Sequence, residues 1–94
     1  MTELLLYGSS GCHLCEQAEE VLKPVLTHIN EQLIRGGLEE AALVLKVVEI
    51  TDFPELMERY SLRIPVIKCA AKADELGWPF DEAQAFDFLV TQLS

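Results

Sequence analysis

The sequence predicts an α/β fold, a four-stranded mixed sheet in the order β-α-β-α-β-β-α with helices on both faces. Short apolar runs, several of them rich in β-branched residues, alternate with segments of helical periodicity. The first two runs are separated by a helix-length segment, which predicts parallel strands joined by a crossover helix. The last two runs lie close enough to form a hairpin, so we expect parallel and antiparallel pairing in one sheet.

The first third of the chain predicts a strand, a turn and a long helix. Residues 4–7, Leu-Leu-Leu-Tyr, form a buried strand that stops at the turn Gly-Ser-Ser-Gly of residues 8–11. The period is helical over residues 14–35, and the glycines at 36–37 supply a stop. Pro24 removes a backbone hydrogen bond inside this helix, so we expect a kink or a division there. The residues expected to face the core are Leu14, Ala18, Val21, Val25 and Ile29.

The middle of the chain predicts a second strand and a short helix. Residues 43–50 are rich in β-branched side chains, which favour strands. Asp52 and Glu55 have the spacing of a capping box, and Pro54 lies in the first turn. A short helix should therefore run to about Tyr60.

The last third predicts a hairpin followed by a helix. Residues 65–69 form the third strand, and residues 74–77 form a weaker fourth strand, joined to it through residues 70–73. Asp81 and Glu82 cap the terminal helix. The residues of that helix expected to face the core are Ala83, Phe86, Leu89, Val90 and Leu93.

Length and charge restrict the classes of function. The chain has 94 residues, which is room for one domain, spanning residues 1–94. Sixteen acidic against seven basic residues give a net charge of −9, which repels phosphate backbones and argues against nucleic-acid binding. No apolar run approaches the ~18 residues of a membrane span, and the first residues lack the basic region of a signal peptide. We therefore expect a monomeric, cytoplasmic protein that does not enter a membrane.

Cys12 and Cys15 form a Cys-x-x-Cys pair on the predicted turn between the first strand and the first helix. Free N–H groups and the positive end of the helix dipole stabilise a thiolate at Cys12. Cys15 lies one helical turn later and can close a disulfide with Cys12. A nucleophile with a resolving thiol beside it is the minimum apparatus for thiol–disulfide exchange. His13, when protonated, would stabilise the thiolate, or it is a solvated side chain.

The cysteines fit a metal or haem site less well than they fit thiol–disulfide exchange. Structural zinc takes four ligands, and the remaining candidates Cys69, His13 and His28 are each unpaired in the sequence, so we expect no metal site. Covalent haem attachment requires His directly after the second cysteine, where Glu16 stands. A chance pair of buried structural thiols stays open at this point. Cys69 follows the strand period and is expected to be a small buried hydrophobe.

Four segments in order resemble the small glutaredoxin-like proteins of the thioredoxin superfamily. Residues 5–18, which contain the cysteine pair, look like the start of these proteins, and residues 49–52 resemble the exit of their second strand. Residues 60–66, Tyr-Ser-Leu-Arg-Ile-Pro-Val, are similar to the segment that carries a cis-proline facing the cysteines. Residues 77–81 resemble the entry to their last helix. The stretch 27–42 is longer than the usual connection before the second strand.

The resemblance implies a nucleophilic Cys12, a resolving Cys15 and a cis bond between Ile64 and Pro65. The backbone of Ile64 would then pair with an extended peptide or thiol substrate. The predicted substrate contacts are Gly11, His13, Ile64, Pro65 and Asp81.

Glutathione recognition is where this chain departs from the family pattern. Glutaredoxins typically have a Lys shortly before the cysteine pair and a Gly-Gly-Asp segment before the last helix. Here residues 8–11 contain no cation, and residues 78–81 are Trp-Pro-Phe-Asp. Asp81 could meet ionic groups of a thiol ligand, or it is an ordinary N-cap.

The sequence therefore predicts a thiol–disulfide oxidoreductase that reduces protein or glutathione mixed disulfides in redox homeostasis. No organic cofactor is expected, and the electrons would come from glutathione or from a reductase of the thioredoxin or glutathione systems. Two alternatives stay open. The first is a binding module that kept the fold without turnover, and the second is a metal or iron–sulfur carrier that uses Cys12.

Overall fold

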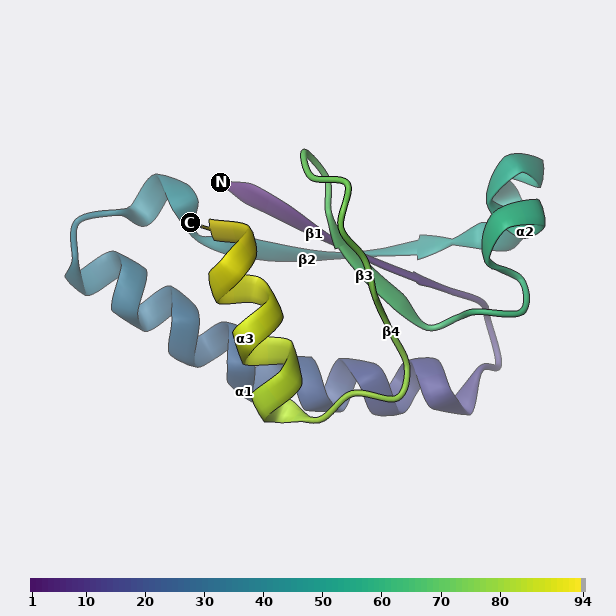
Figure 1. Ribbon diagram of the computed structural model, residues 1–94, viewed down its shortest axis with the longest axis horizontal. Coiled ribbons are helices and arrows are strands. Elements are labelled where there is room, and N and C mark those ends of the chain that lie inside the picture. The colour runs from purple at the N-terminus through teal and green to yellow at the C-terminus, as the bar shows by residue number, and fades with distance from the viewer. Residues whose placement is uncertain (94) are drawn as a thin grey trace.

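The computed structural model describes residues 1–93 and has the predicted order of elements around a four-stranded mixed sheet (Figure 1). Two short 3₁₀ turns, Glu39–Ala41 and Ile50–Asp52, flank the second strand. The strands and helices are β1 (Thr2–Gly8), α1 (His13–Arg35), β2 (Leu43–Glu49), α2 (Pro54–Tyr60), β3 (Val66–Cys69), β4 (Leu76–Gly77) and α3 (Glu82–Leu93).

The sheet has the strand order β2-β1-β3-β4. β1 is parallel to β2, with Cα partners running from Thr2↔Leu43 to Gly8↔Glu49. β3 is antiparallel to β1, and β4 is antiparallel to β3. Because β1 and β2 are parallel, their carboxyl ends meet at one end of the sheet, where the chain turns into α1.

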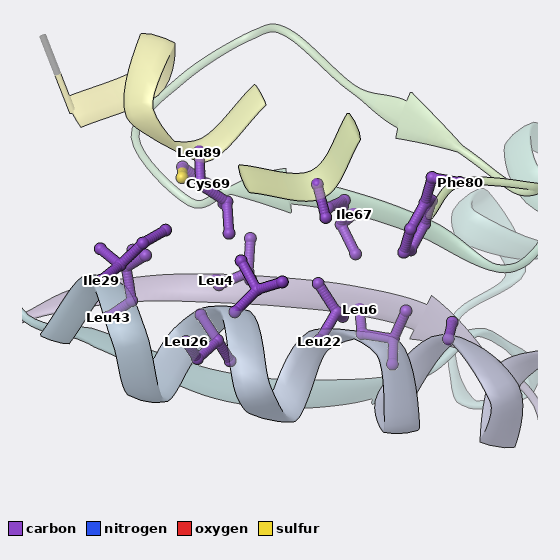
Figure 2. Close-up of a cluster of buried hydrophobic side chains, with 13 residues drawn as sticks. Leu4, Leu6, Leu22, Leu26, Ile29, Leu43, Ile67, Cys69, Phe80 and Leu89 are labelled. Carbon is purple, nitrogen blue, oxygen red and sulfur yellow. The ribbon is translucent and has the colours of Figure 1, made fainter. Parts of the chain in front are cut away.

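Alternate residues of β1 contact helices on opposite faces of the sheet. Leu4 and Leu6 are fully buried in a core cluster with α1 and α3, as Figure 2 shows. Leu5 and Tyr7 belong to a second cluster, which includes Leu56 of α2. The two-residue period of the strand thus separates two apolar layers, and the prediction of helices on both faces is confirmed.

The first helix runs unbroken from His13 to Arg35, so the predicted division at Pro24 is wrong. Pro24 and Glu20, whose backbone hydrogen bond the proline removes, are both exposed. The lost bond therefore lies where water can replace it, while Leu22 and Val25 are buried on either side of the proline. The final turns of this helix occupy most of the stretch 27–42.

The buried faces of two helices are rotated relative to the prediction. Leu14 is 45% exposed, and Cys15 takes its place toward the sheet. In α3, Ala83 is exposed and Val90 is 43% exposed, whereas Ala85 and Leu89 are fully buried. The buried residues of α1 are Cys15, Ala18, Leu22, Val25, Leu26 and Ile29. No helix among residues 1–93 combines the length and the apolar character that crossing a bilayer requires.

Element ends differ from the prediction by one to three residues. Ile50 leaves β2 to begin a 3₁₀ turn, and β4 contains two residues instead of four. The predicted capping box at Asp52 does not form, because Asp52 ends that turn and Phe53 is the N-cap of α2, with no side-chain hydrogen bond to the helix. Pro54 occupies the first turn as expected.

Candidate active site

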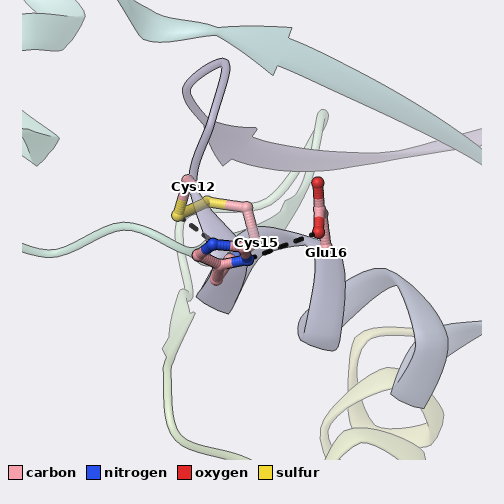
Figure 3. A network of polar contacts seen from close by, with 4 residues as sticks. Cys12, Cys15 and Glu16 are labelled. Carbon is pink, nitrogen blue, oxygen red and sulfur yellow. Dashed lines mark hydrogen bonds and ion pairs between the residues drawn. A yellow bond between two sulfur atoms is a disulfide. The ribbon is translucent and has the colours of Figure 1, made fainter.

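The two cysteines of the Cys-x-x-Cys pair form a disulfide at the start of α1 (Figure 3). Their Cα atoms are 5.3 Å apart, inside the range usual for disulfides. Cys12 is the N-cap residue of the helix, and its sulfur accepts a hydrogen bond from the backbone N–H of Cys15 at 3.2 Å. The first cysteine therefore lies where free N–H groups and the helix dipole favour negative charge.

The two sulfurs differ in access to solvent. Cys15 is 8% exposed and packs against the sheet, whereas Cys12 is only partly buried. Gly11, with a positive φ of 77°, makes the turn that presents Cys12 at its outer corner. An incoming group therefore meets Cys12 before it can reach Cys15.

Gly8 allows the first turn of α1 to approach the end of β1. A Cβ atom at Gly8 would lie 2.9 Å from the sulfur of Cys15 and 3.3 Å from its Cβ atom. The sulfur is held in a disulfide and cannot rotate away. A side chain at this position would therefore push the disulfide and the end of the strand apart.

Glu49, at the end of β2, anchors the turn that carries Cys12. Its Oε1 accepts hydrogen bonds from the backbone N–H of Ser10 at 2.7 Å and from the hydroxyl of Ser10. The hydroxyl bond is the largest of the effects that hold the pKa of Glu49 below its ordinary value of 4.5. The other oxygen, Oε2, is buried and has no hydrogen-bond partner within residues 1–93.

A pocket of about 310 Å³ opens beside the disulfide. Its charged lining residues, Glu16, Glu19 and Glu49, are all acidic. His13 does not line the pocket; its side chain is 91% exposed and lies 3.8 Å from that of Glu16. The pocket is lined by Leu6, by residues 8–12, by Cys15, Glu16 and Glu19 of α1, and by Val47 and Glu49 of β2.

The predicted cis bond between Ile64 and Pro65 is confirmed. The β1–β3 register pairs Tyr7 with Val66, so the next step along both strands brings Pro65 opposite Gly8, at the disulfide end of the sheet. The N–H of Ile64 donates to the carbonyl of Tyr60 at 3.1 Å. Only the carbonyl of Ile64 is therefore left to pair with a substrate backbone.

Of the remaining predicted contacts, one lines the pocket and three do not, and Pro65 is fully buried. Gly11 lines the pocket with the cysteines, whereas Ile64, Pro65 and Asp81 do not. Asp81 caps α3: its carboxylate accepts from the N–H of Gln84 at 2.8 Å, and the Gln84 side chain accepts from the N–H of Asp81. The Trp78–Pro79 bond before this cap is also cis, which the sequence did not predict.

Cys69 is 2% exposed in the main core cluster, as expected of a small buried hydrophobe. Burial raises the pKa of its thiol. His28 lies beside Phe86, with ring centroids 5.8 Å apart. Across residues 1–93, no three His, Cys, Asp or Glu side chains are grouped so that they could hold a metal ion.

Ser10, Val47 and Glu49 were missed by the sequence analysis, although each lines the pocket. One signal was present: parallel strands bring their carboxyl ends together, so the last residue of β2 had to lie near the turn after β1. A carboxylate at that position was therefore a candidate. The hydrogen bond between Glu49 and Ser10 joins residues that are 39 positions apart, so no local sequence pattern predicts it.

Comparison with known proteins identifies a family. The model of the Glutaredoxin-like domain (DUF836) matches residues 3–90 of this chain. No match was found among curated proteins.

Two solved structures of one protein are similar to this chain over nearly its whole length. The X-ray structure of the Northeast Structural Genomics target protein XcR50 from X. campestris is 32% identical, with a TM-score of 0.70, and covers 94% of this chain and 96% of its own. The solution structure of that target is 33% identical, with a TM-score of 0.69, and covers 97% and 95%.

We expect Gly8→Ala to destabilise the oxidised protein by about 1–3 kcal/mol, because the new methyl group overpacks the Cys15 sulfur. Gly77→Ala is the matched control, since a Cβ atom there has open space, and it should change stability by less than about 1 kcal/mol. Urea unfolding of both oxidised variants measures the difference. Equal stability of the two variants would contradict the close approach at Gly8.

The lowered pKa of Glu49 predicts an acid-dependent loss of stability. A carboxyl group with a folded-state pKa below its unfolded value stabilises the fold above pH 4.5, and that contribution is lost as the pH falls through the lowered value. Glu49→Gln should therefore lose less stability than the wild type between neutral pH and pH ~3. Glu19→Gln is the control, because Glu19 lines the same pocket and its side chain makes no hydrogen bond within residues 1–93. Identical pH profiles for wild type and Glu49→Gln would refute the prediction.

Proposed function

The chain belongs to the glutaredoxin-like domain family of the thioredoxin superfamily, and from this premise we propose that it is a thiol–disulfide oxidoreductase with Cys12 as nucleophile and Cys15 as resolving thiol. One observation carries the proposal. The disulfide joins the partly exposed N-cap residue of a 23-residue helix to a residue one turn inside it. A dithiol in this arrangement can close a disulfide within the first turn of α1.

The different surroundings of the two sulfurs support their assigned roles. Once the disulfide is reduced, Cys12 retains the N–H of Cys15 as a donor and the positive end of α1 beneath it. Cys15 is buried against Gly8 and is reached mainly by a group already attached to Cys12. The exposed sulfur is thus suited to start exchange, and the buried sulfur is suited to finish it.

Reduction of a substrate proceeds in two displacements. The Cys12 thiolate attacks one sulfur of the substrate disulfide, a mixed disulfide forms, and the other substrate sulfur leaves and takes up a proton. Cys15 then loses its proton, attacks the Cys12 sulfur and closes the disulfide, releasing the second substrate thiol. Two electrons and two protons pass to the substrate, and either two equivalents of glutathione or one equivalent of a dithiol of a reductase system returns them to the enzyme.

The charge of the pocket favours protein disulfides over glutathione as substrates. The acidic and basic side chains that line it are the three carboxylates of Glu16, Glu19 and Glu49, and glutathione carries a net negative charge at neutral pH. Asp81 is already bonded as the N-cap of α3. No cation lining the pocket is available to bind the tripeptide carboxylates.

Single-cysteine variants test the proposed roles. We expect the thiol of Cys15→Ser, which is Cys12, to be alkylated at neutral pH at least about tenfold faster than the thiol of Cys12→Ser, because only Cys12 is both accessible and stabilised as a thiolate. Cys15→Ser should also accumulate a mixed disulfide that the wild type resolves. Cys69→Ser in both backgrounds removes the third thiol as a control.

Three outcomes would count against these roles. A faster thiol in Cys12→Ser would reverse the assignment. Absence of exchange with any disulfide would favour the binding module. Iron or zinc bound stoichiometrically by protein purified without oxygen would favour the carrier.

Glutathione-coupled turnover should be poor, and exchange with a dithiol donor should be at least about tenfold faster, because no cationic side chain lines the pocket to donate a charge-assisted hydrogen bond to the tripeptide carboxylates. Assays at low and high salt separate long-range repulsion, which salt screens, from a missing binding site, which it does not affect. Turnover with glutathione equal to that of an ordinary dithiol glutaredoxin would overturn this expectation.

A further inference from the structure

β2 is the outermost strand beside the active site. Only some of the backbone groups along its outer edge make hydrogen bonds within the part of the chain that the structure describes. The carbonyl of Ala42 accepts from the N–H of Thr2 in β1 and therefore points inward, while the N–H of Ala42 donates to the carbonyl of Glu39. Backbone groups alternate along a strand, and those of Leu43, Leu45 and Val47 therefore point outward. The N–H of Glu49 points outward as well, while its carbonyl begins the 3₁₀ turn that follows.

A side chain already closes the first of these outward positions. Asn30 of α1 donates to the carbonyl of Leu43 at 2.9 Å and accepts from its N–H at 2.8 Å, in the way that a neighbouring strand would. Within residues 1–93, no hydrogen bond closes the outward groups of Leu45 or Val47. The open part of the edge is thus confined to the half of β2 that leads toward the disulfide.

This open edge is continuous with the pocket of Cys12. Val47 and Glu49 line the pocket together with Cys12, and Val47 is 54% exposed. An extended chain paired with Leu45 and Val47 would run directly into the pocket. The cis-proline segment has fewer free backbone groups with which to bind a substrate strand, since the N–H of Ile64 is already bonded to Tyr60.

We infer that the outer edge of β2 from Leu45 to Glu49 binds an extended, basic segment of a disulfide-containing polypeptide as an added strand, and so delivers its disulfide to Cys12. The inference rests on the proposed function and names its substrate class. Docking itself makes and breaks no covalent bond, and the exchange that follows is the two-step displacement already described. Pairing to the backbone supplies affinity, and the flanking carboxylates select the charge of the segment.

Charge decides between a substrate and a second copy of this chain. The carboxylates of Glu16, Glu19 and Glu49 border the end of the open edge, and no basic side chain lines the pocket. Two copies, each with a net charge of −9, would repel one another on approach. A segment with Lys or Arg near its cystine gains attraction at the same place.

The test uses pre-reduced protein and a synthetic peptide whose single Cys is joined to 2-thiopyridine through a disulfide. Attack by Cys12 on the peptide sulfur releases thiopyridone, which absorbs light and gives the second-order rate constant. Two further peptides carry backbone N-methyl groups on alternate residues, in the two registers offset by one residue. We expect one register to slow the reaction at least about tenfold, because it removes the peptide N–H groups that would donate to the carbonyls of Leu45 and Val47, and the other to have little effect.

A protein variant tests the same edge from the other side. Val47→Pro removes an outward N–H and should lower, by about tenfold, the ratio of the rate with the peptide to the rate with an uncharged hydroxyethyl 2-pyridyl disulfide. Val44→Ala is the control, because the backbone groups of Val44 face β1, and it should keep the wild-type ratio. A peptide with Lys on both sides of its Cys should react about fivefold faster than one with Glu at low salt, with the difference shrinking at high salt.

The outcomes separate this inference from the proposed function. If the wild type releases thiopyridone from neither probe, the proposed function fails. If it reacts with both but neither N-methyl register matters, or acidic peptides react as fast as basic ones, only the inference fails. Sedimentation of wild type and Val47→Pro provides the last check: a dimer that the variant converts to a monomer would assign the edge to a second copy and overturn the inference.

Discussion

The contact between the end of β1 and the first turn of α1 is the constraint on which the site depends. Gly8 has no side chain, so the sulfur of Cys15 can lie where a Cβ atom would otherwise be, 2.9 Å from that position. This approach buries Cys15 and leaves Cys12 at the outer corner of the turn. Because β1 is the inner partner of both β2 and β3, a shift at Gly8 would also disturb the pairing on both of its sides.

Two opposing electrostatic effects act on the exposed sulfur. The N-terminus of a 23-residue helix and the N–H of Cys15 favour negative charge on Cys12. The carboxylates of Glu16, Glu19 and Glu49 line the same pocket and disfavour it. Glu49 contributes to both structure and charge, because its hydrogen bonds hold Ser10 in the turn while its own charge stays at the pocket wall. The site thus combines a backbone environment suited to a thiolate with a side-chain environment suited to cationic partners.

The order of strands and helices could be predicted from residue periodicity, because each element forms from residues that are close together in the chain. The same patterns were less accurate about helix faces. Leu14 was expected in the core and is exposed, whereas Cys15 packs against Gly8 on the same helix face as the buried Ala18 and Leu22. Pro24 was expected to kink or divide the helix, but the helix is not divided there, and the proline and the residue whose bond it removes are both exposed.

The sequence by itself determined the placement of Cys12 and Cys15 at the start of a helix, the mixed sheet and the cis bond before Pro65, the last through family resemblance. Only the tertiary structure decided that Glu49 anchors Ser10, that the N–H of Ile64 is occupied, and that Asn30 closes the edge of β2 at Leu43. The physical reason is the separation along the chain of the residues that make contact. A helix start or a strand is specified by residues a few positions apart, whereas these contacts join atoms whose proximity exists only after the sheet and helices have packed.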